Sequence, residues 1–129
     1  MARNFKDLEV FRLSYDLVLD VYKIVDKIEG EKDFVSQVKR AVVSVPLNIA
    51  EGCSRFSKKG FLQFLSYSYG SLRELEVLFM LGMDLKFVKE EEYLEIEEKR
   101  DRVSKKLFLF MKKVEKDKWF DWFKWEKFL

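Results

Sequence analysis

Turn-forming residues are scarce in this chain, and no other feature of the sequence constrains the fold as strongly. One proline, Pro46, and five glycines are spread over 129 residues. An all-β domain of this length would need many tight turns, which are built mainly from glycine, proline, asparagine and aspartate. The sequence therefore predicts a few long helices joined by short connections.

Four segments place apolar residues three or four positions apart, which is the spacing of one face of an α-helix. The predicted helices cover about residues 5–28, 33–56, 57–85 and 90–114, with Asp33 and Ser57 as N-caps of the second and third. The apolar stripes are, helix by helix, Phe11, Tyr15, Val18, Tyr22, Val25 and Ile28; Val38, Val42, Val45, Ile49, Cys53 and Phe56; Phe61, Leu65, Ser68, Leu72, Leu75, Phe79 and Gly82; and Tyr93, Ile96, Arg100, Val103, Leu107, Phe110 and Val114. Because short connections make consecutive helices antiparallel neighbours, we predict an all-α, up-down-up-down four-helix bundle. Pro46 removes a backbone donor from the second helix, so a kink is predicted there.

The chain divides into a bundle, residues 1–118, and an aromatic C-terminal tail, residues 119–129. The tail holds all three tryptophans of the chain, together with Phe120, Phe123, Phe128 and Leu129. So much aromatic surface at a chain end is poorly covered in a monomer. We expect the tail to pack on the bundle or on a neighbouring subunit, in preference to stacking on nucleobases or entering a membrane interface.

Composition argues against catalysis, metal binding and membrane insertion. The chain has no histidine, the commonest general base and zinc ligand, and its single cysteine, Cys53, lies on an apolar stripe and is expected to be buried and inert. No segment approaches the roughly 18 apolar residues of a membrane span, and the N-terminus lacks a signal peptide. We therefore expect a cytoplasmic protein that is not an enzyme and holds no metal or cofactor.

A polar stripe lies opposite the apolar stripe of the second predicted helix. It consists of Arg40, Ser44, Asn48, Glu51 and Arg55. Apolar residues flank it, so we expect the stripe to face protein and to pair with Ser71 and Glu74 of the third helix, with Arg40 mostly buried. The acids Glu51 and Glu74 could also serve acid/base chemistry, but structural pairing is the favoured interpretation because no nucleophile accompanies them.

Basic residues gather in two stretches of the sequence. Lys39, Arg55, Lys58 and Lys59 surround the end of the second predicted helix, and Lys105, Lys106, Lys112 and Lys113 lie on the fourth. These eight side chains are our candidates for a phosphate-binding surface. A solvated face that aids solubility is the alternative, since the net charge is only +2.

Several motifs resemble those of the four-helix-bundle proteins encoded within intervening sequences of bacterial 23S rRNA genes. They are Phe5-Lys6-Asp7-Leu8, the run Gln-Val-Lys-Arg-Ala-Val-Val-Ser-Val-Pro-Leu-Asn-Ile-Ala-Glu-Gly at residues 37–52, Phe-Leu-Gln-Phe-Leu at 61–65 and Gly-Ser-Leu-Arg-Glu-Leu-Glu at 70–76. The similarity covers about residues 5–115, and the aromatic tail is unlike the family's usual ending. The resemblance implies a homopentameric ring associated with ribosomal RNA. A similar branch implies instead an accessory subunit of diversity-generating retroelements, which binds a reverse transcriptase and nucleic acid.

Residues and resemblance together predict a non-catalytic, homo-oligomeric scaffold, most simply a pentamer, whose basic patches contact RNA or an RNA-bound protein. The alternative is a structural assembly factor that binds only proteins. An enzyme that uses Glu51, Glu74 and Arg40 is the least favoured hypothesis, because a bundle interior gives such residues a structural role first.

Overall fold

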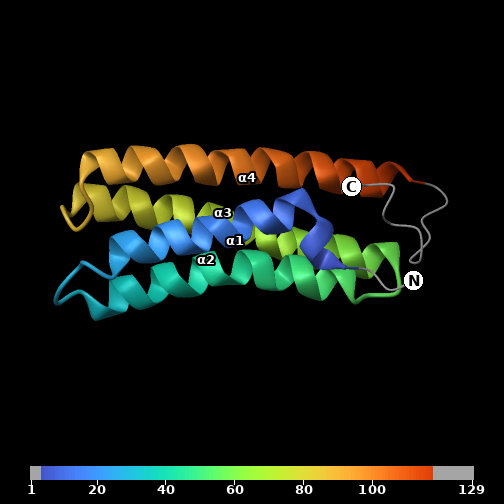
Figure 1. The fold of residues 1–129 in the computed structure, drawn as a ribbon, viewed down its shortest axis with the longest axis horizontal. Coiled ribbons are helices and arrows are strands. Elements are labelled where there is room, and N and C mark those ends of the chain that lie inside the picture. The colour runs from blue at the N-terminus through green and yellow to red at the C-terminus, as the bar shows by residue number, and fades with distance from the viewer. Residues whose placement is uncertain (1–3, 118–129) are drawn as a thin grey trace.

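The computed structural model describes residues 4–117, and in this range it contains four α-helices and no strand. A short 3-10 turn, Phe5–Asp7, precedes helices α1 (Glu9–Val25), α2 (Lys32–Cys53), α3 (Lys58–Asp84) and α4 (Glu90–Lys116). The predicted all-α class is confirmed. In Figure 1 the α1–α2 and α3–α4 connections lie at one end of the bundle, and the α2–α3 connection lies at the other.

Ion pairs fix the relative direction of α1 and α4. Lys27, just after α1, binds Glu92 in the first turn of α4 at 2.8 Å. Toward the opposite end, Glu9 in the first turn of α1 binds Lys106 in the second half of α4 at 3.1 Å. The end of α1 therefore lies beside the beginning of α4, and the two helices run in opposite directions.

Backbone conformation and side-chain capping set where the helices begin and end. Gly30 has a φ of 82°, a left-handed conformation that glycine adopts without strain, and it separates α1 from α2. The Ser57 side chain accepts a hydrogen bond from the Gly60 amide at 3.0 Å, which confirms Ser57 as the N-cap of α3. The prediction for Asp33 is wrong: α2 is preceded by Glu31, and Asp33 lies inside the first turn, where its charge suits the helix dipole.

The core contains the predicted stripes of the second, third and fourth helices almost unchanged. Phe61, Leu65 and Leu107 are fully buried within it. Phe56 departs from the prediction because α2 ends at Cys53, and its side chain is 80% exposed. Tyr93 is half-buried at the edge of the core.

In α1 the predicted stripe is displaced by about one residue. The buried face consists of Val10, Ser14, Leu17, Val21, Ile24 and Val25. Of the predicted stripe, Tyr15 is 52% exposed, whereas Phe11 and Val18 pack against the core from its margin. Helix α1 carries two adjacent apolar stripes, and periodicity alone does not choose the one that faces inward.

Pro46 is buried within α2, which continues through it without interruption from Lys32 to Cys53. Helix α3 contacts α2 next to Pro46, where Ser68 donates a hydrogen bond to the Val45 carbonyl at 2.8 Å. The kink at Pro46 stays a prediction. The aromatic tail, residues 119–129, lies outside the described residues, so its predicted packing stays a prediction too.

Candidate nucleic-acid interface

The α2–α3 connection brings three of the eight basic candidates to one end of the bundle. Arg55 precedes α3, binds Glu51 at 2.6 Å and places its guanidinium carbon 4.3 Å from the centre of the Phe64 ring. Lys58 begins α3, donates a hydrogen bond to the Glu115 carbonyl at 3.1 Å and donates another to the Asp117 carbonyl. An ammonium group there neutralises the negative end of the α4 dipole and joins the beginning of α3 to the end of α4. Lys59 follows and is exposed.

The second half of α4 adds four more basic candidates toward the same end of the bundle. Lys105 binds Asp101 at 2.9 Å, Lys106 binds Glu9 at 3.1 Å, and Lys112 binds Glu115 at 3.4 Å. These pairs are partly or fully exposed, so water and salt screen them and each holds its lysine only weakly. A phosphate group can therefore compete with the carboxylates for the same ammonium groups.

Lys39 lies away from the other seven candidates. It binds Asp26 at 2.7 Å, and its ammonium lies 4.7 Å from the centre of the Tyr22 ring. The hydrogen bond to Asp26 raises the pKa of Lys39 above its ordinary value. Asp26 follows the end of α1, so Lys39 belongs to the opposite half of the bundle and is not part of a common surface with the other basic candidates.

Charge is distributed unequally between the two ends of the bundle. We call residues 4–12, 51–60 and 105–117 the basic end, where the cations are Lys6, Arg12, Arg55, Lys58, Lys59, Lys105, Lys106, Lys112, Lys113 and Lys116 against Asp7, Glu9, Glu51, Glu115 and Asp117. We call residues 23–33 and 84–92 the acidic end, where the acids are Asp26, Glu29, Glu31, Asp33, Asp84, Glu90, Glu91 and Glu92 against Lys23, Lys27, Lys32, Lys86 and Lys89. A nearly neutral chain thus carries a local positive surface.

The predicted polar network of α2 is only partly present. Ser44 donates to the Ala41 carbonyl and contacts the Ser71 hydroxyl at 2.5 Å, and the Asn48 side chain donates to the Ser44 carbonyl at 2.8 Å. The contact between Ser44 and Ser71 joins α2 to α3, whereas the hydrogen bond from Asn48 stays within α2. These hydroxyl and amide groups are therefore satisfied at a half-buried boundary.

The charged members of that network are placed differently from the prediction. Arg40 is exposed instead of buried, and it forms no ion pair with any described residue. Glu74 is exposed as well, and Glu51 binds Arg55 instead of Arg40. The physical reason is that α2 turns this side outward in the single chain, where long charged side chains remain in water.

Arg100 lies on the predicted apolar stripe of the fourth helix and, unlike Arg40, it is buried. Its side chain is 5% exposed, and it binds Glu97 through two nitrogens at 2.7 and 2.8 Å, Glu76 at 3.4 Å and Asp101 at 3.8 Å. Burial alone would lower the pKa of Arg100, but the neighbouring carboxylates outweigh it, so its pKa lies above the ordinary value. The partners of Arg100 were not predicted from the sequence, and Glu97, three residues earlier on the same helix face, was the signal that could have found the first of them.

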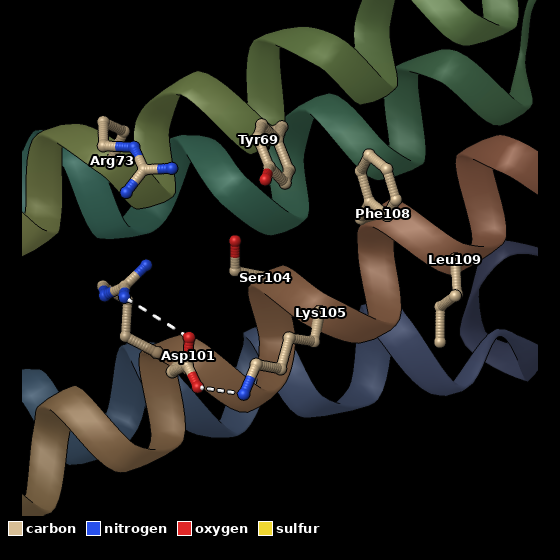
Figure 2. Close-up of a pocket in the computed structure, with 8 residues that line it drawn as sticks. Tyr69, Arg73, Asp101, Ser104, Lys105, Phe108 and Leu109 are labelled. Atoms are coloured by element: carbon tan, nitrogen blue, oxygen red, sulfur yellow. Dashed lines mark ion pairs between the residues drawn. The ribbon is translucent and has the colours of Figure 1, made fainter.

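Arg100 lies at a hollow of about 450 Å³ between α3 and α4. In Figure 2, Tyr69 and Arg73 reach toward this hollow from α3, and Ser104 and Phe108 reach toward it from α4. The Tyr69 and Phe108 ring centres lie 6.2 Å apart. Because three carboxylates already surround Arg100, this hollow offers less net positive charge to a phosphate than the basic end does.

Residues 4–117 contain no group of three or more histidine, cysteine, aspartate or glutamate side chains able to hold a metal ion. Among the helices of the same range, none combines the length and the apolar character needed to cross a membrane. The only cysteine of the chain, Cys53, is buried.

Comparisons with known proteins agree with the fold. Residues 6–108 match the model of the 23S rRNA-intervening sequence protein family. A comparison with curated proteins found no match. A crystal structure of a protein of unknown function from the S23 ribosomal protein family of Bacteroides thetaiotaomicron is similar, with 20% sequence identity and a TM-score of 0.74 over 80% of this chain and 98% of that chain. At this identity the likeness supports the fold alone.

Proposed function

The chain belongs to the 23S rRNA-intervening sequence protein family, and from this premise we propose that it is a non-catalytic, homo-oligomeric scaffold that binds RNA through the basic end of its bundle. The observation that carries the proposal is that the basic side chains of the α2–α3 connection and of the end of α4 lie at the same end of the bundle, where Lys58 donates a hydrogen bond to the Glu115 carbonyl. Lysine and arginine side chains contact phosphates without reading bases, so binding depends on salt and little on sequence. We place this activity in the cytoplasm.

Assembly into a ring, which we take to be a pentamer, is the second element of the proposal. The outward side of α2 carries Leu47, which is 63% exposed, and Tyr67 on the neighbouring helix α3 is 47% exposed. Exposed apolar surface of this kind is typical of subunit interfaces. A ring would repeat the basic end in every subunit, so weak contacts with one RNA would combine into useful avidity.

Light scattering tests the assembly. The wild-type protein is expected to have the mass of a multimer at micromolar concentration, and Leu47→Arg is expected to lower that mass because a charge would enter the interface. Leu94→Arg, which alters an equally exposed leucine on α4, is the matched control. A monomeric wild type would contradict the assembly, and an unchanged mass in Leu47→Arg would move the interface away from α2.

Fluorescence anisotropy with a structured RNA at low salt tests binding. We expect the variant with Lys59→Gln, Lys112→Gln and Lys113→Gln to bind more weakly than the wild type. Each lost phosphate contact should reduce the steepness of the plot of log affinity against log salt by roughly 0.7–0.9, and the three together by about 2–3. Lys58 is left intact because it binds the end of α4 and its removal would disturb the fold.

A control variant with the same change in net charge distinguishes RNA binding at the basic end from general electrostatic attraction to the whole protein. Lys23→Gln, Lys32→Gln and Lys86→Gln remove three exposed lysines from the acidic end, and this variant is expected to bind like the wild type. Equal losses in both variants would contradict a basic-end site. No binding of the wild type at tens of micromolar protein would contradict RNA binding itself, since non-specific affinities commonly reach that range.

The alternative function is an assembly factor that binds only proteins, including a nucleic-acid-bound protein such as a reverse transcriptase. It is favoured by the ion pairs that already engage Lys105, Lys106 and Lys112 with carboxylates. Absence of RNA binding together with intact oligomers would support this alternative.

A further inference from the structure

A groove lies between the beginning of α1 and the second half of α4, close to the point where the described chain ends. Its apolar lining consists of Leu8, Val10, Leu109 and Phe110, and its polar rim consists of Glu9, Lys106 and Lys113. The groove has a volume of about 230 Å³. Leu109 at its edge is 67% exposed, which is a large apolar surface for a leucine to leave in water.

The chain itself supplies a segment whose chemistry suits this groove. Residues 118–129 follow the described part and contain Trp119, Phe120, Trp122, Phe123, Trp125, Phe128 and Leu129. Burying an aromatic ring of this size stabilises a fold by roughly 2–3 kcal/mol, so an apolar groove within reach of the segment is a favourable place for one. Lysine ammonium groups on the rim add a second attraction, because cations bind the faces of tryptophan rings.

The groove is within reach of the segment. Helix α4 ends at Lys116, only three residues after Lys113 on the groove's rim and seven residues after Leu109. At about 1.5 Å per helical residue, Leu109 lies roughly 10 Å back along the helix. Three or four extended residues span that distance, because each covers about 3.3 Å. Asp117 has an extended backbone with a ψ of 105°, so the chain leaves the helical direction there.

We propose that the aromatic segment 118–129 folds back along α4 of its own chain and packs a tryptophan ring against Leu109 in the α1–α4 groove. Lys106 and Lys113 then lie beside the ring face. A segment tethered within a few residues of its site has an effective concentration in the millimolar range, so modest attraction is enough to hold it. This inference goes beyond the proposed function and does not depend on RNA binding.

Intrinsic tryptophan fluorescence tests the proposal directly, because all three tryptophans of the chain lie in this segment. The emission of the folded wild type is expected at shorter wavelength than that of the urea-unfolded chain, with less quenching by acrylamide. Leu109→Ala is expected to shift the emission toward the unfolded value while far-UV circular dichroism stays unchanged. An emission maximum equal to that of the unfolded chain, or no shift in Leu109→Ala, would overturn the proposal.

Two matched variants locate the site. Leu94→Ala removes an equally exposed leucine near the other end of α4 and is expected to leave the emission unchanged. Phe108→Ala alters the hollow between α3 and α4 but not the α1–α4 groove, and it is also expected to leave the emission unchanged. A shift in Phe108→Ala as large as that in Leu109→Ala would place the segment in the other hollow and overturn the proposal.

A mixing experiment separates the chain's own groove from that of a neighbouring subunit. Chains with Leu109→Ala are mixed, through unfolding and refolding, with an excess of chains that carry Trp119→Phe, Trp122→Phe and Trp125→Phe. Only the first kind emits tryptophan fluorescence, and only the second kind has an intact groove. The proposal expects the emission to stay shifted, and a return to the wild-type wavelength would show docking on a neighbour and overturn it.

Discussion

Substitution by alanine is expected to destabilise the fold strongly at one arginine of this chain and hardly at all at another. Arg100→Ala would remove a guanidinium that is 5% exposed and that holds Glu97, Glu76 and Asp101 together. Breaking a fully buried ion pair costs about 3–5 kcal/mol. The three carboxylates keep 25–45% of their side-chain surface in water and can be rehydrated there. Water therefore lowers the expected loss to about 2 kcal/mol.

Arg40→Ala is the comparison, because Arg40 is exposed and forms no ion pair with a described residue. Its expected cost is within about 0.5 kcal/mol. Urea unfolding followed by circular dichroism measures both, at one fixed protein concentration because assembly shifts apparent stability. With a urea slope of about 2 kcal/mol per molar, Arg100→Ala lowers the midpoint by about 1 M.

The conservative variant Arg100→Lys separates charge from geometry. It keeps one positive charge but loses the planar fork that binds Glu97 through two nitrogens, so its stability is expected between those of the wild type and Arg100→Ala. Equal losses in Arg40→Ala and Arg100→Ala would refute the reasoning. Such a result would mean that Arg40 finds a buried partner, as the sequence had indicated, which in an oligomer would belong to another subunit.

Three further predictions concern stability and are read from thermal unfolding. Gly82→Ala is expected to destabilise the bundle, because a Cβ atom would lie 2.7 Å from the Phe34 ring. Gly70→Ala is expected to stabilise it by about 0.5–1 kcal/mol, since Gly70 lies inside α3 with no atom within 4 Å of an added Cβ; a loss would indicate a contact with another subunit. Burial tends to raise the pKa of Glu92, but hydrogen bonds, foremost the one from Lys27, hold it below the ordinary 4.5. Glu92 therefore stabilises the fold above about pH 4.5, and this contribution is lost as the pH falls further. The loss of stability in acid should be smaller in Glu92→Gln, and an unchanged acid profile would contradict the role of Glu92.

The fold was predictable from the sequence because three of the four apolar stripes leave a single choice of inward face. In α3 the spacing from Phe61 to Gly82 admits one buried side, and the structure buries it. Helix α1 was harder because Val10 and Phe11 begin two neighbouring stripes, and only packing against the other helices selects between them.

The charged residues were harder to place than the apolar ones. The sequence predicted Arg40 in a buried polar network and Arg100 on an apolar stripe, yet Arg40 is exposed and only Arg100 is buried. The difference comes from Glu76, Glu97 and Asp101, which surround Arg100 from two helices and offset the cost of removing it from water. Glu97 and Asp101 lie close to Arg100 on α4, but Glu76 comes from α3, so a helical wheel of α4 cannot show it.

The unequal ends of the bundle give each subunit an electric dipole moment along its helices. In a ring with cyclic symmetry, the components of these moments perpendicular to the ring axis cancel, whereas the components along the axis add with every subunit. The tilt of the bundle against the ring axis therefore decides whether the assembly has a positive face and a negative face or a positive rim. A polar ring of the first kind would meet an RNA with one face only, and its two faces would attract each other into stacked rings at low ionic strength.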